Sequence, residues 1–330
     1  MDYTFVGVLT SPHALALFLR LALINVDIET LKLFCDVIQL KGFTQAAAAN
    51  SITQSAVSQR IKSLENRFGL PLIERHGSDL RLTKPGEMVY RSAKRILGEF
   101  REVEERMEEW KGKEGGIVRL AAIYSVGLYE LDPFLKKFLK NHPNIDVHIE
   151  YGRASKIYQD VVNDSIDLGI VAYPSQRPQL GSIPLSNDEL VIICRPDHPF
   201  SQHDSISLSQ LDSQPFVAFH REIPTRRAID EILKRQGVSV VTKAEFDNIE
   251  LIKRAVEIGL GISVVPSVTV KSEIQAGLLK AVALSEGPFM RPIAVLYRRG
   301  RSLPLGVKKF LDVLTEDTAQ PTSESVHSRV

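Results

Sequence analysis

The chain of 330 residues contains only two cysteines, Cys35 and Cys194, which lie far apart in the sequence. They show no metal-ligand spacing, which argues against a zinc site. Cys35 lies beside Leu31, Phe34 and Ile38 on the apolar side of an expected helix, so we expect a packed thiol and not a redox sensor. This sparse cysteine usage predicts a protein of the reducing cytoplasm.

Long apolar runs and catalytic motifs are missing as well. The most apolar stretch, residues 14–24, is too short for a membrane span and carries Arg20. The eight histidines show no H-x-H or H-E-x-x-H spacing. The G-x-G that begins at Gly259 lacks a third glycine and lies between an expected helix and an expected strand. We therefore expect a soluble protein that is not an enzyme and that uses no metal or cofactor.

Residues 43–68 carry the most informative pattern in the chain. They predict two short helices joined by a tight turn, the first capped by Thr44 and the second beginning at Thr53 or Gln54. The AAAA run of the first helix lets the second helix pack closely across it. The second helix has an apolar face formed by Val57, Ile61, Leu64 and Phe68. Its opposite face carries side chains able to hydrogen-bond to DNA, namely Gln54, Ser55, Ser58, Gln59 and Lys62.

A helix-turn-helix is one interpretation of this pattern, and a pair of helices in an ordinary helical bundle is the other. Two further features favour the first. Residues 73–83 alternate as a two-stranded wing with a turn at residues 76–79. Ten Lys or Arg against five Asp or Glu lie between Gln54 and Arg101, so this stretch carries +5, whereas the whole chain carries only +1. Such a local excess of positive charge favours a polyanionic partner.

With these motifs in place, residues 28–86 resemble the winged helix-turn-helix of LysR-type bacterial transcriptional regulators. The shared motifs are Gly42-Phe43-Thr44, Ala46-Ala47, Thr53-Gln54-Ser55-Ala56-Val57-Ser58, Leu64-Glu65, Phe68 to Arg75, and Leu82-Thr83-Lys84-Pro85-Gly86. Asn50 stands where the family more commonly has an apolar residue, and Gln59 stands where it more commonly has arginine. The resemblance implies a homodimer, paired into a tetramer, that binds an interrupted inverted repeat in promoter DNA and contacts RNA polymerase.

The next segment predicts one long linker helix, from Pro85 or Glu87 to about Trp110. Its apolar residues recur at alternating spacings of four and three, which is a heptad pattern. This apolar stripe consists of Val89, Ala93, Ile96, Phe100, Val103, Met107 and Trp110. Because charged residues flank the stripe closely, we expect a dimer through this helix, with packing inside one chain as the alternative. A dimer would place two recognition helices on successive major grooves.

From residue 117 onward strands alternate with helices, which predicts an α/β domain with a mostly parallel sheet. The expected strands are residues 116–123, 145–151, 168–172, 190–195, 216–219, 238–246, 262–266 and 293–297. The expected helices are residues 125–141, 155–163, 225–237, 249–258 and 306–314. This part resembles the effector domain of the same family, on the motifs Ser165-Ile166-Asp167-Leu168-Gly169-Ile170, Pro196-Asp197-His198-Pro199 and Gly259-Leu260-Gly261-Ile262-Ser263. The resemblance implies two α/β lobes, like those of periplasmic solute-binding proteins, with a small-molecule effector between them.

These patterns divide the chain into segments. We expect an N-terminal extension at 1–25, the winged helix-turn-helix at 26–84, the linker helix at 85–113, the effector domain at 117–316 and a disordered tail at 317–330. Lobe 1 would comprise about 117–188 and 290–316, and lobe 2 about 189–289. We interpret the extension as an over-extended gene start, with an amphipathic helix at residues 13–24 as the alternative.

Ligands of open α/β sheets bind at the carboxyl ends of strands, where helix N-termini offer free amides. By resemblance, the residues expected to contact the effector are Ser125 and Arg153, followed by His220, Arg221, Thr225 and Asn248. Helix capping is the alternative for such residues, and we favour it for Ser155. Because arginine and helix amides select negative charge, a small anion or carboxylate is the expected effector.

The sequence therefore predicts a sequence-specific DNA-binding transcriptional regulator that an anionic effector controls. Gln54, Ser55 and Gln59 would read bases. The phosphate contacts would come from Thr44, Thr53, Ser58, Lys62, Arg75 and Arg81. A stand-alone α/β ligand-binding protein without a DNA role is the alternative, and a scaffolding dimer is a third interpretation.

Overall fold

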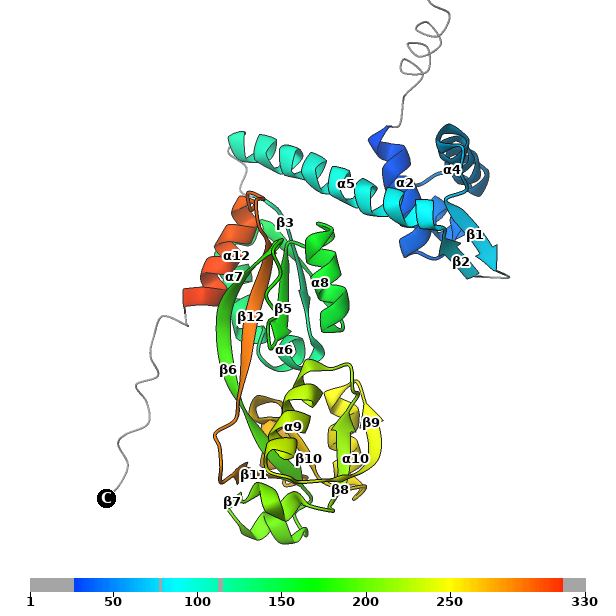
Figure 1. Cartoon of the computed structure of the whole chain (residues 1–330). Coiled ribbons are helices and arrows are strands. Elements are labelled where there is room, and N and C mark those ends of the chain that lie inside the picture. Colours follow the sequence, from blue (N-terminus) through cyan, green and yellow to red (C-terminus); the bar gives the residue numbers. More distant parts are fainter. Residues whose placement is uncertain (1–26, 77–78, 112–114, 317–330) are drawn as a thin grey trace, which may run out of the picture. The chain divides into compact units, whose positions relative to one another are not determined.

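The computed structural model describes residues 27–76, 79–111 and 115–316, which form two compact units that divide between Arg101 and Glu102 (Figure 1). The N-terminal extension and the tail that the sequence predicts lie outside the described residues. In the part that is described, no helix is long and apolar enough to cross a membrane.

The first unit contains the expected helix-turn-helix and its wing. It comprises helices α2 (Ile28–Gln39), α3 (Phe43–Ala49) and α4 (Gln54–Phe68) and the antiparallel strands β1 (Ile73–His76) and β2 (Asp79–Leu82). One buried core joins the three helices to the wing, and it consists of Leu33, Phe34, Val37, Ala46, Ala47, Val57, Ile61, Leu64 and Leu72. The buried Ala46 and Ala47 have side chains short enough for α3 to pack closely, as the sequence predicts.

Two local predictions in this unit are wrong. Helix α3 begins at Phe43 and has Gly42 at its N-cap position, so Thr44 lies inside the helix and does not cap it. Phe68 is 45% exposed and does not complete the buried face of α4. The reason is that α4 ends at Phe68, where Gly69 turns the chain in the left-handed conformation at φ 66°.

Polar side chains also tie the first unit together. The Glu65 carboxylate accepts a hydrogen bond from the backbone N–H of Leu72 (2.8 Å), which links α4 to the start of the wing. Asn50 donates to the Asp36 carboxylate (2.8 Å) and accepts from the Lys32 ammonium (2.7 Å), both on α2. Asn50 thus forms a polar link between the end of α3 and helix α2.

Helix α5 (Lys84–Trp110) is the expected linker helix. Cys35 is buried beside its Ala93, and burial raises the pKa of the Cys35 thiol to about 12, in line with the predicted packed thiol. Val89 packs against the core of the first unit. The other members of the apolar stripe are exposed on α5, namely Ile96, Phe100, Val103, Met107 and Trp110. The first two stripe residues therefore pack within their own chain, whereas the last five form an exposed apolar surface.

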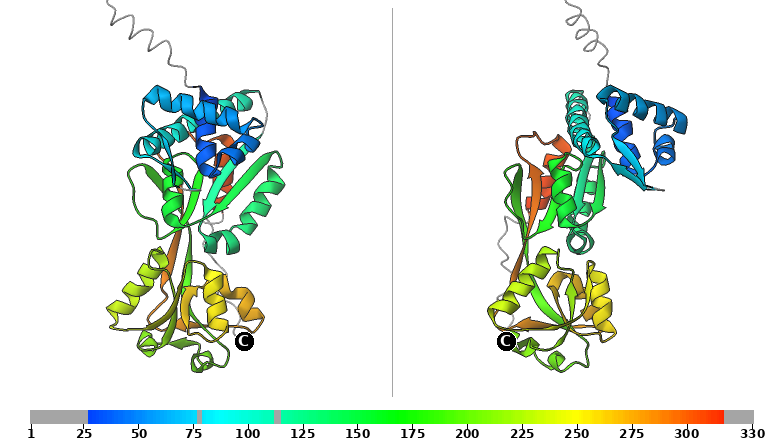
Figure 2. Two further views of the ribbon diagram at one scale, coloured as in Figure 1. Left: turned by 90° about the vertical axis from the view of Figure 1, so that its right-hand side faces the viewer. Right: turned by 45° about the vertical axis from the view of Figure 1, so that its right-hand side comes forward.

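The second unit is the two-lobed α/β domain (Figure 2). In lobe 1, strands β3 (Gly116–Ala122), β4 (Ile145–Tyr151) and β5 (Leu168–Ala172) are parallel, and β12 (Met290–Arg298) pairs antiparallel with β5. One face of this sheet packs against α6 (Tyr124–Tyr129), α7 (Asp132–Asn141) and α12 (Leu305–Glu316), and the other packs against α8 (Ala154–Val162). The parallel part of the predicted sheet is confirmed.

Lobe 2 is joined to lobe 1 by two long antiparallel strands. Strand β6 (Leu180–Cys194) pairs with β12 over residues 180–189, and with β10 (Ser263–Pro266) and β11 (Lys280–Leu284) over residues 190–194. The other strands of lobe 2 are β7 (Ser205–Ile206) and the parallel pair β8 (Pro215–Phe219) and β9 (Val241–Phe246). Its α-helices are α9 (Pro224–Arg235), α10 (Ile249–Glu257) and α11 (Lys271–Gln275). Three short 3-10 helices complete the lobe, namely η1 (Pro199–Gln202), η2 (Leu208–Leu211) and η3 (Ser267–Val270).

The structure corrects several predicted elements of this domain. The single helix expected at 125–141 is two helices, because Pro133 occupies the first turn of α7 and cannot continue a preceding helix. The strand expected at 190–195 is only the last third of β6, whose residues 180–189 pair with β12. Strands β7 and β11 were not predicted. The helix expected at 155–163 begins at Ala154 with Arg153 at its N-cap position, so Ser155 lies within α8 and does not cap it.

Candidate functional site

The first candidate site is the exposed face of α4 in the helix-turn-helix. Thr53 caps α4, since its hydroxyl accepts a hydrogen bond from the backbone N–H of Ala56 (3.2 Å). The same hydroxyl lies 2.9 Å from that of Ser55, and the Gln54 amide donates to the Ser58 hydroxyl at 3.4 Å. These contacts align the polar side chains at the start of the helix. Further along, Gln59 and Lys62 are exposed.

The remaining predicted phosphate contacts lie on other elements of the first unit. Thr44 is exposed on α3, and Arg81 is exposed on β2 opposite Glu74 of β1. Arg75 lies on β1, and its side chain is outside the described part of the structure. The residues predicted to read bases are thus all exposed on α4, whereas the predicted phosphate contacts are spread over α3, α4 and the wing.

The second candidate site is a cleft of about 590 Å³ between the two lobes of the α/β domain. Four of the six predicted effector residues line it, namely Ser125, Arg153, His220 and Thr225. Arg221 and Asn248 do not. Arg221 is exposed beside Glu245 at 3.5 Å, and the Asn248 side chain caps α10 by accepting from the Glu250 N–H at 2.8 Å. The capping alternative therefore describes Asn248.

Arg153 connects the two lobes across the cleft. Its guanidinium lies 2.8 Å from the Asp247 carboxylate and 3.4 Å from that of Glu222, both in lobe 2. The hydrogen bond from Arg153 lowers the pKa of Asp247. Because all three side chains are about half exposed or more, this bridge contributes little stability and can exchange partners with a ligand.

Arg291 was not predicted from the sequence, yet this residue lines the cleft and is 1% exposed. Its guanidinium donates to the Ser125 hydroxyl (2.6 Å) and lies 3.6 Å from the Asp188 carboxylate. Two further guanidinium nitrogens, Nε and Nη1, are buried without a hydrogen-bond partner among the described residues. The only available signal was a lone arginine beside the apolar run of residues 293–296.

Two buried carboxyl groups lie behind Arg291. Burial raises the pKa of Glu130 and that of Asp188, while the nearby Arg291 charge lowers both. The Ser186 hydroxyl donates to Glu130 (3.0 Å), and the Ser267 hydroxyl donates to Asp188 (3.0 Å). The positive charge of Arg291 is therefore balanced by carboxyl groups of the protein on this side. On its other side the guanidinium donates to Ser125, which lines the cleft.

A third arginine of the cleft, Arg177, packs against an aromatic ring. The Arg177 guanidinium lies 4.2 Å from the ring centroid of Tyr158, whose hydroxyl accepts a hydrogen bond from the backbone N–H of Ser175 (2.7 Å). All three residues line the cleft. Lobe 1 thus contributes three arginines to the cleft, and two of them, Arg153 and Arg177, are exposed.

Comparisons with known proteins identify the two domains that contain these candidate sites. Residues 28–87 match the model of the bacterial regulatory helix-turn-helix protein of the lysR family, and residues 111–319 match the LysR substrate binding domain. YeiE of Escherichia coli, described as an uncharacterised HTH-type transcriptional regulator, is 28% identical over 288 residues, which cover 87% of this chain and 97% of the relative.

Two solved structures are similar to this chain, one over most of its length and one over a shorter part. Full-length OxyR of Pseudomonas aeruginosa, a cysteine-to-aspartate variant, has a TM-score of 0.72 at 23% identity and covers 88% of this chain and 95% of its own. The CcmR regulatory domain of Synechocystis, in complex with 2-PG, has a TM-score of 0.58 at 29% identity and covers 62% of this chain and 98% of its own.

A winged helix-turn-helix followed by a two-lobed α/β domain with a ligand-sized cleft defines a DNA-binding transcriptional regulator with an effector-binding domain. The chain belongs to the LysR family of transcriptional regulators. The match over residues 28–87 favours this function over a stand-alone ligand-binding protein.

Proposed function

We propose that the effector of this regulator is a small anion that binds in the interlobe cleft at Arg291 and Ser125. The observation that carries this proposal is a buried guanidinium, 1% exposed, that lines a ligand-sized space and donates to the Ser125 hydroxyl of the same cleft wall. A buried arginine favours a carboxylate or phosphate because both accept its planar set of donors. The complex of the related CcmR domain with 2-PG supports a ligand in this domain.

Ligand binding would act on the contacts that cross the cleft. An anion held at Arg291 in lobe 1 can also reach lobe 2 residues of the cleft wall, such as His220 and Thr225. The anion would compete with Asp247 for Arg153 and so change the contact that links the two lobes. A ligand shifts an equilibrium only through its different affinity for the two states, and bridging both lobes supplies that difference. The altered domain would then change promoter DNA binding and contact with RNA polymerase.

On the DNA side, we propose that Gln54, Ser55 and Gln59 read base edges and that Lys62 holds a phosphate. Gln59→Ala should weaken binding to the operator by about 1–3 kcal/mol and leave binding to random DNA nearly unchanged. Lys62→Ala should weaken both and reduce the slope of log affinity against log salt by about 1. Fluorescence anisotropy on the upstream intergenic DNA and on a scrambled duplex, over a salt series, measures both effects.

Ser63→Ala is a matched control, since Ser63 is exposed on α4 outside the proposed contact set. It should change neither the affinity nor the salt slope. Equal losses on operator and scrambled DNA for Gln59→Ala would remove the base-reading role. Negligible binding of the unmodified protein to either duplex at low salt would count against a DNA-binding function.

The exposed apolar stripe of α5 suits a second copy of the chain, and we propose a homodimer through it. Phe100 is 42% exposed at its middle. Phe100→Glu should shift the protein from dimer to monomer in multi-angle light scattering, because a buried unpaired carboxylate opposes the interface. Glu99→Gln, on an exposed neighbouring position, should leave the mass unchanged. An unaltered mass for Phe100→Glu would place the dimer contact elsewhere.

A further inference from the structure

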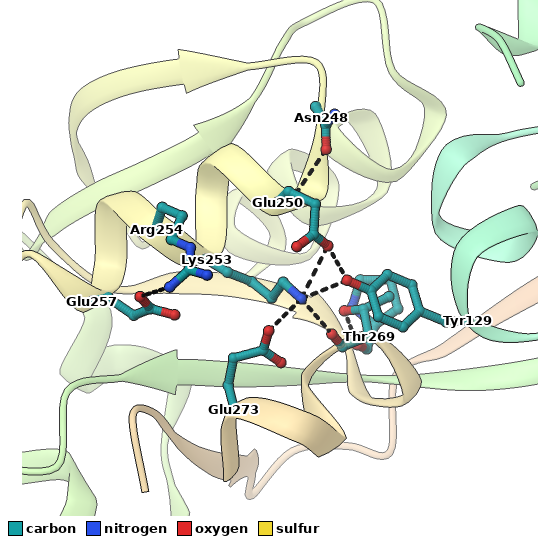
Figure 3. Close-up of polar contacts among 9 residues, drawn as sticks. Tyr129, Asn248, Glu250, Lys253, Arg254, Glu257, Thr269 and Glu273 are labelled. Carbon is teal, nitrogen blue, oxygen red and sulfur yellow. Dashed lines mark hydrogen bonds and ion pairs between the residues drawn. The ribbon is translucent and has the colours of Figure 1, made fainter. Parts of the chain in front are cut away.

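Lys253 of α10 is one of the few buried cations of the α/β domain and does not line the cleft (Figure 3). Its side chain is 3% exposed. The ammonium lies 2.6 Å from the Glu273 carboxylate, 3.0 Å from that of Glu250 and 3.1 Å from the carbonyl of Thr269. Burying an ammonium is costly unless it is paired and hydrogen-bonded, and these acceptors meet that requirement within lobe 2.

The fourth partner of the ammonium comes from the other lobe. Lys253 donates to the Tyr129 hydroxyl at 2.5 Å, and this hydroxyl in turn donates to the Glu250 carboxylate. The ammonium also lies 4.7 Å from the centroid of the Tyr129 ring. Tyr129 ends helix α6 of lobe 1, and its ring packs against the buried core of lobe 2. The tyrosine therefore connects the lobes independently of strands β6 and β12.

Both helices that carry this contact begin at the cleft. Helix α6 starts beside Ser125, which lines the cleft and accepts the hydrogen bond from Arg291, and it ends at Tyr129. Helix α10 starts at Ile249, which also lines the cleft, and carries Lys253 one turn later. Movement of one lobe against the other thus changes the cleft and the Tyr129 to Lys253 contact together.

We propose that Tyr129 and Lys253 are positioning residues that hold the two lobes at the separation at which the cleft binds its ligand, without touching that ligand. Two extended strands alone resist twisting and bending weakly, and a half-buried tyrosine whose hydroxyl is hydrogen-bonded to Lys253 and Glu250 of lobe 2 restricts this freedom. The proposal deepens the anion-binding function of the same cleft, but its first test does not depend on any ligand.

Tyr129→Phe is the informative change, because it keeps the ring and its packing and removes only the hydroxyl. Nitroxide labels on Lys136→Cys in α7 and Lys234→Cys in α9 report the interlobe distance by pulsed electron resonance in the full chain, diluted with unlabelled chains. The native thiols will label poorly, since burial raises the pKa of Cys35 to about 12 and that of Cys194 to about 11. We expect a broader distance distribution in Tyr129→Phe.

Inorganic phosphate serves as the probe in the second readout. The apparent phosphate affinity is proportional to the fraction of molecules in which the lobes stand at the separation that binds phosphate. Because Tyr129→Phe lowers this fraction by removing one hydrogen-bonding group, we expect about a three- to tenfold loss of apparent affinity. Tyr297→Phe is the matched control, because Tyr297 lies on β12 and packs within the core of lobe 1. It should change neither the distance distribution nor the affinity.

A distance distribution of Tyr129→Phe that equals that of the unmodified protein would overturn the proposal. Equal broadening in Tyr129→Phe and Tyr297→Phe would overturn it too, because it would reveal a general loosening of lobe 1. Absence of phosphate binding in every variant, including the unmodified chain, would contradict the anion site and not the lobe contact, which the distances decide alone.

Discussion

Arg291→Met is expected to abolish binding of inorganic phosphate and to lower the free energy of unfolding by about 3–5 kcal/mol. The guanidinium is buried, and its removal leaves Asp188 without its cation and Glu130 with only the smaller effect of the Lys271 charge. Calorimetry measures the first effect, and urea unfolding followed by circular dichroism measures the second. Fluorescence is a poor probe because the only tryptophan, Trp110, is 83% exposed.

The stability loss of Arg291→Met should depend on pH. Burial already raises the pKa of Glu130 and of Asp188, and loss of the Arg291 charge raises both further. A carboxyl group with a raised pKa binds more protons in the folded state, so the stability it contributes is present at low pH and is lost as pH rises through the folded pKa. The deficit of the variant should therefore shrink as the pH is lowered from neutral.

Arg195→Gln provides the control for Arg291→Met. Arg195 forms two hydrogen bonds with the Asp197 carboxylate (2.9 and 2.7 Å) on the surface of lobe 2 and does not contact the cleft. Its replacement should leave phosphate binding, stability and their pH dependence nearly unchanged. Wild-type phosphate affinity in Arg291→Met would contradict the proposed anion site, and a pH-independent deficit would contradict the role of the two carboxyl groups.

The DNA-binding unit was largely predictable because its determinants are local. The apolar face of α4 and the alternation of the wing are periodic patterns within a few residues, and the buried alanines predicted the close packing of α3. The errors at Thr44 and Phe68 lie at helix ends, where one residue changes the assignment. The role of Glu65 in holding the start of the wing appears only when the two segments are brought together.

The cleft was less predictable because its key contacts join distant parts of the sequence. Arg291 and Ser125 are 166 residues apart, and Lys253 and Tyr129 are 124 apart. No periodic pattern marks such pairs, and a lone charge in an apolar segment does not reveal its partner. Residues 180–189 of β6 were missed for a related reason. Their burial does not alternate regularly, and they form a strand by pairing with β12, which lies about a hundred residues later.

Gly86→Ala is expected to destabilise the winged helix-turn-helix by about 3 kcal/mol or more and to abolish operator binding. Gly86 lies in the first turn of α5. A Cβ added there would clash with the backbone carbonyl of Leu72, because it would lie only 2.9 Å from the carbonyl carbon. Leu72 is fully buried, and its carbonyl accepts a hydrogen bond from the Thr83 N–H at 3.0 Å. Neither the backbone at Leu72 nor the start of α5 can therefore move without losing these contacts. Thermal unfolding by circular dichroism and anisotropy on operator DNA measure the two losses.

Gly69→Ala separates this clash from the general effect of replacing a glycine. Gly69 adopts φ 66° at the end of α4, and an added Cβ there meets no atom within 4 Å. Its replacement should therefore cost only the strain of a left-handed residue, about 1 kcal/mol, and retain operator binding. Phosphate binding by the α/β domain should persist in both variants, because neither glycine belongs to that unit. Similar losses for Gly86→Ala and Gly69→Ala would contradict the argument that the close approach of α5 to Leu72 determines the need for glycine in the Leu82 to Gly86 motif.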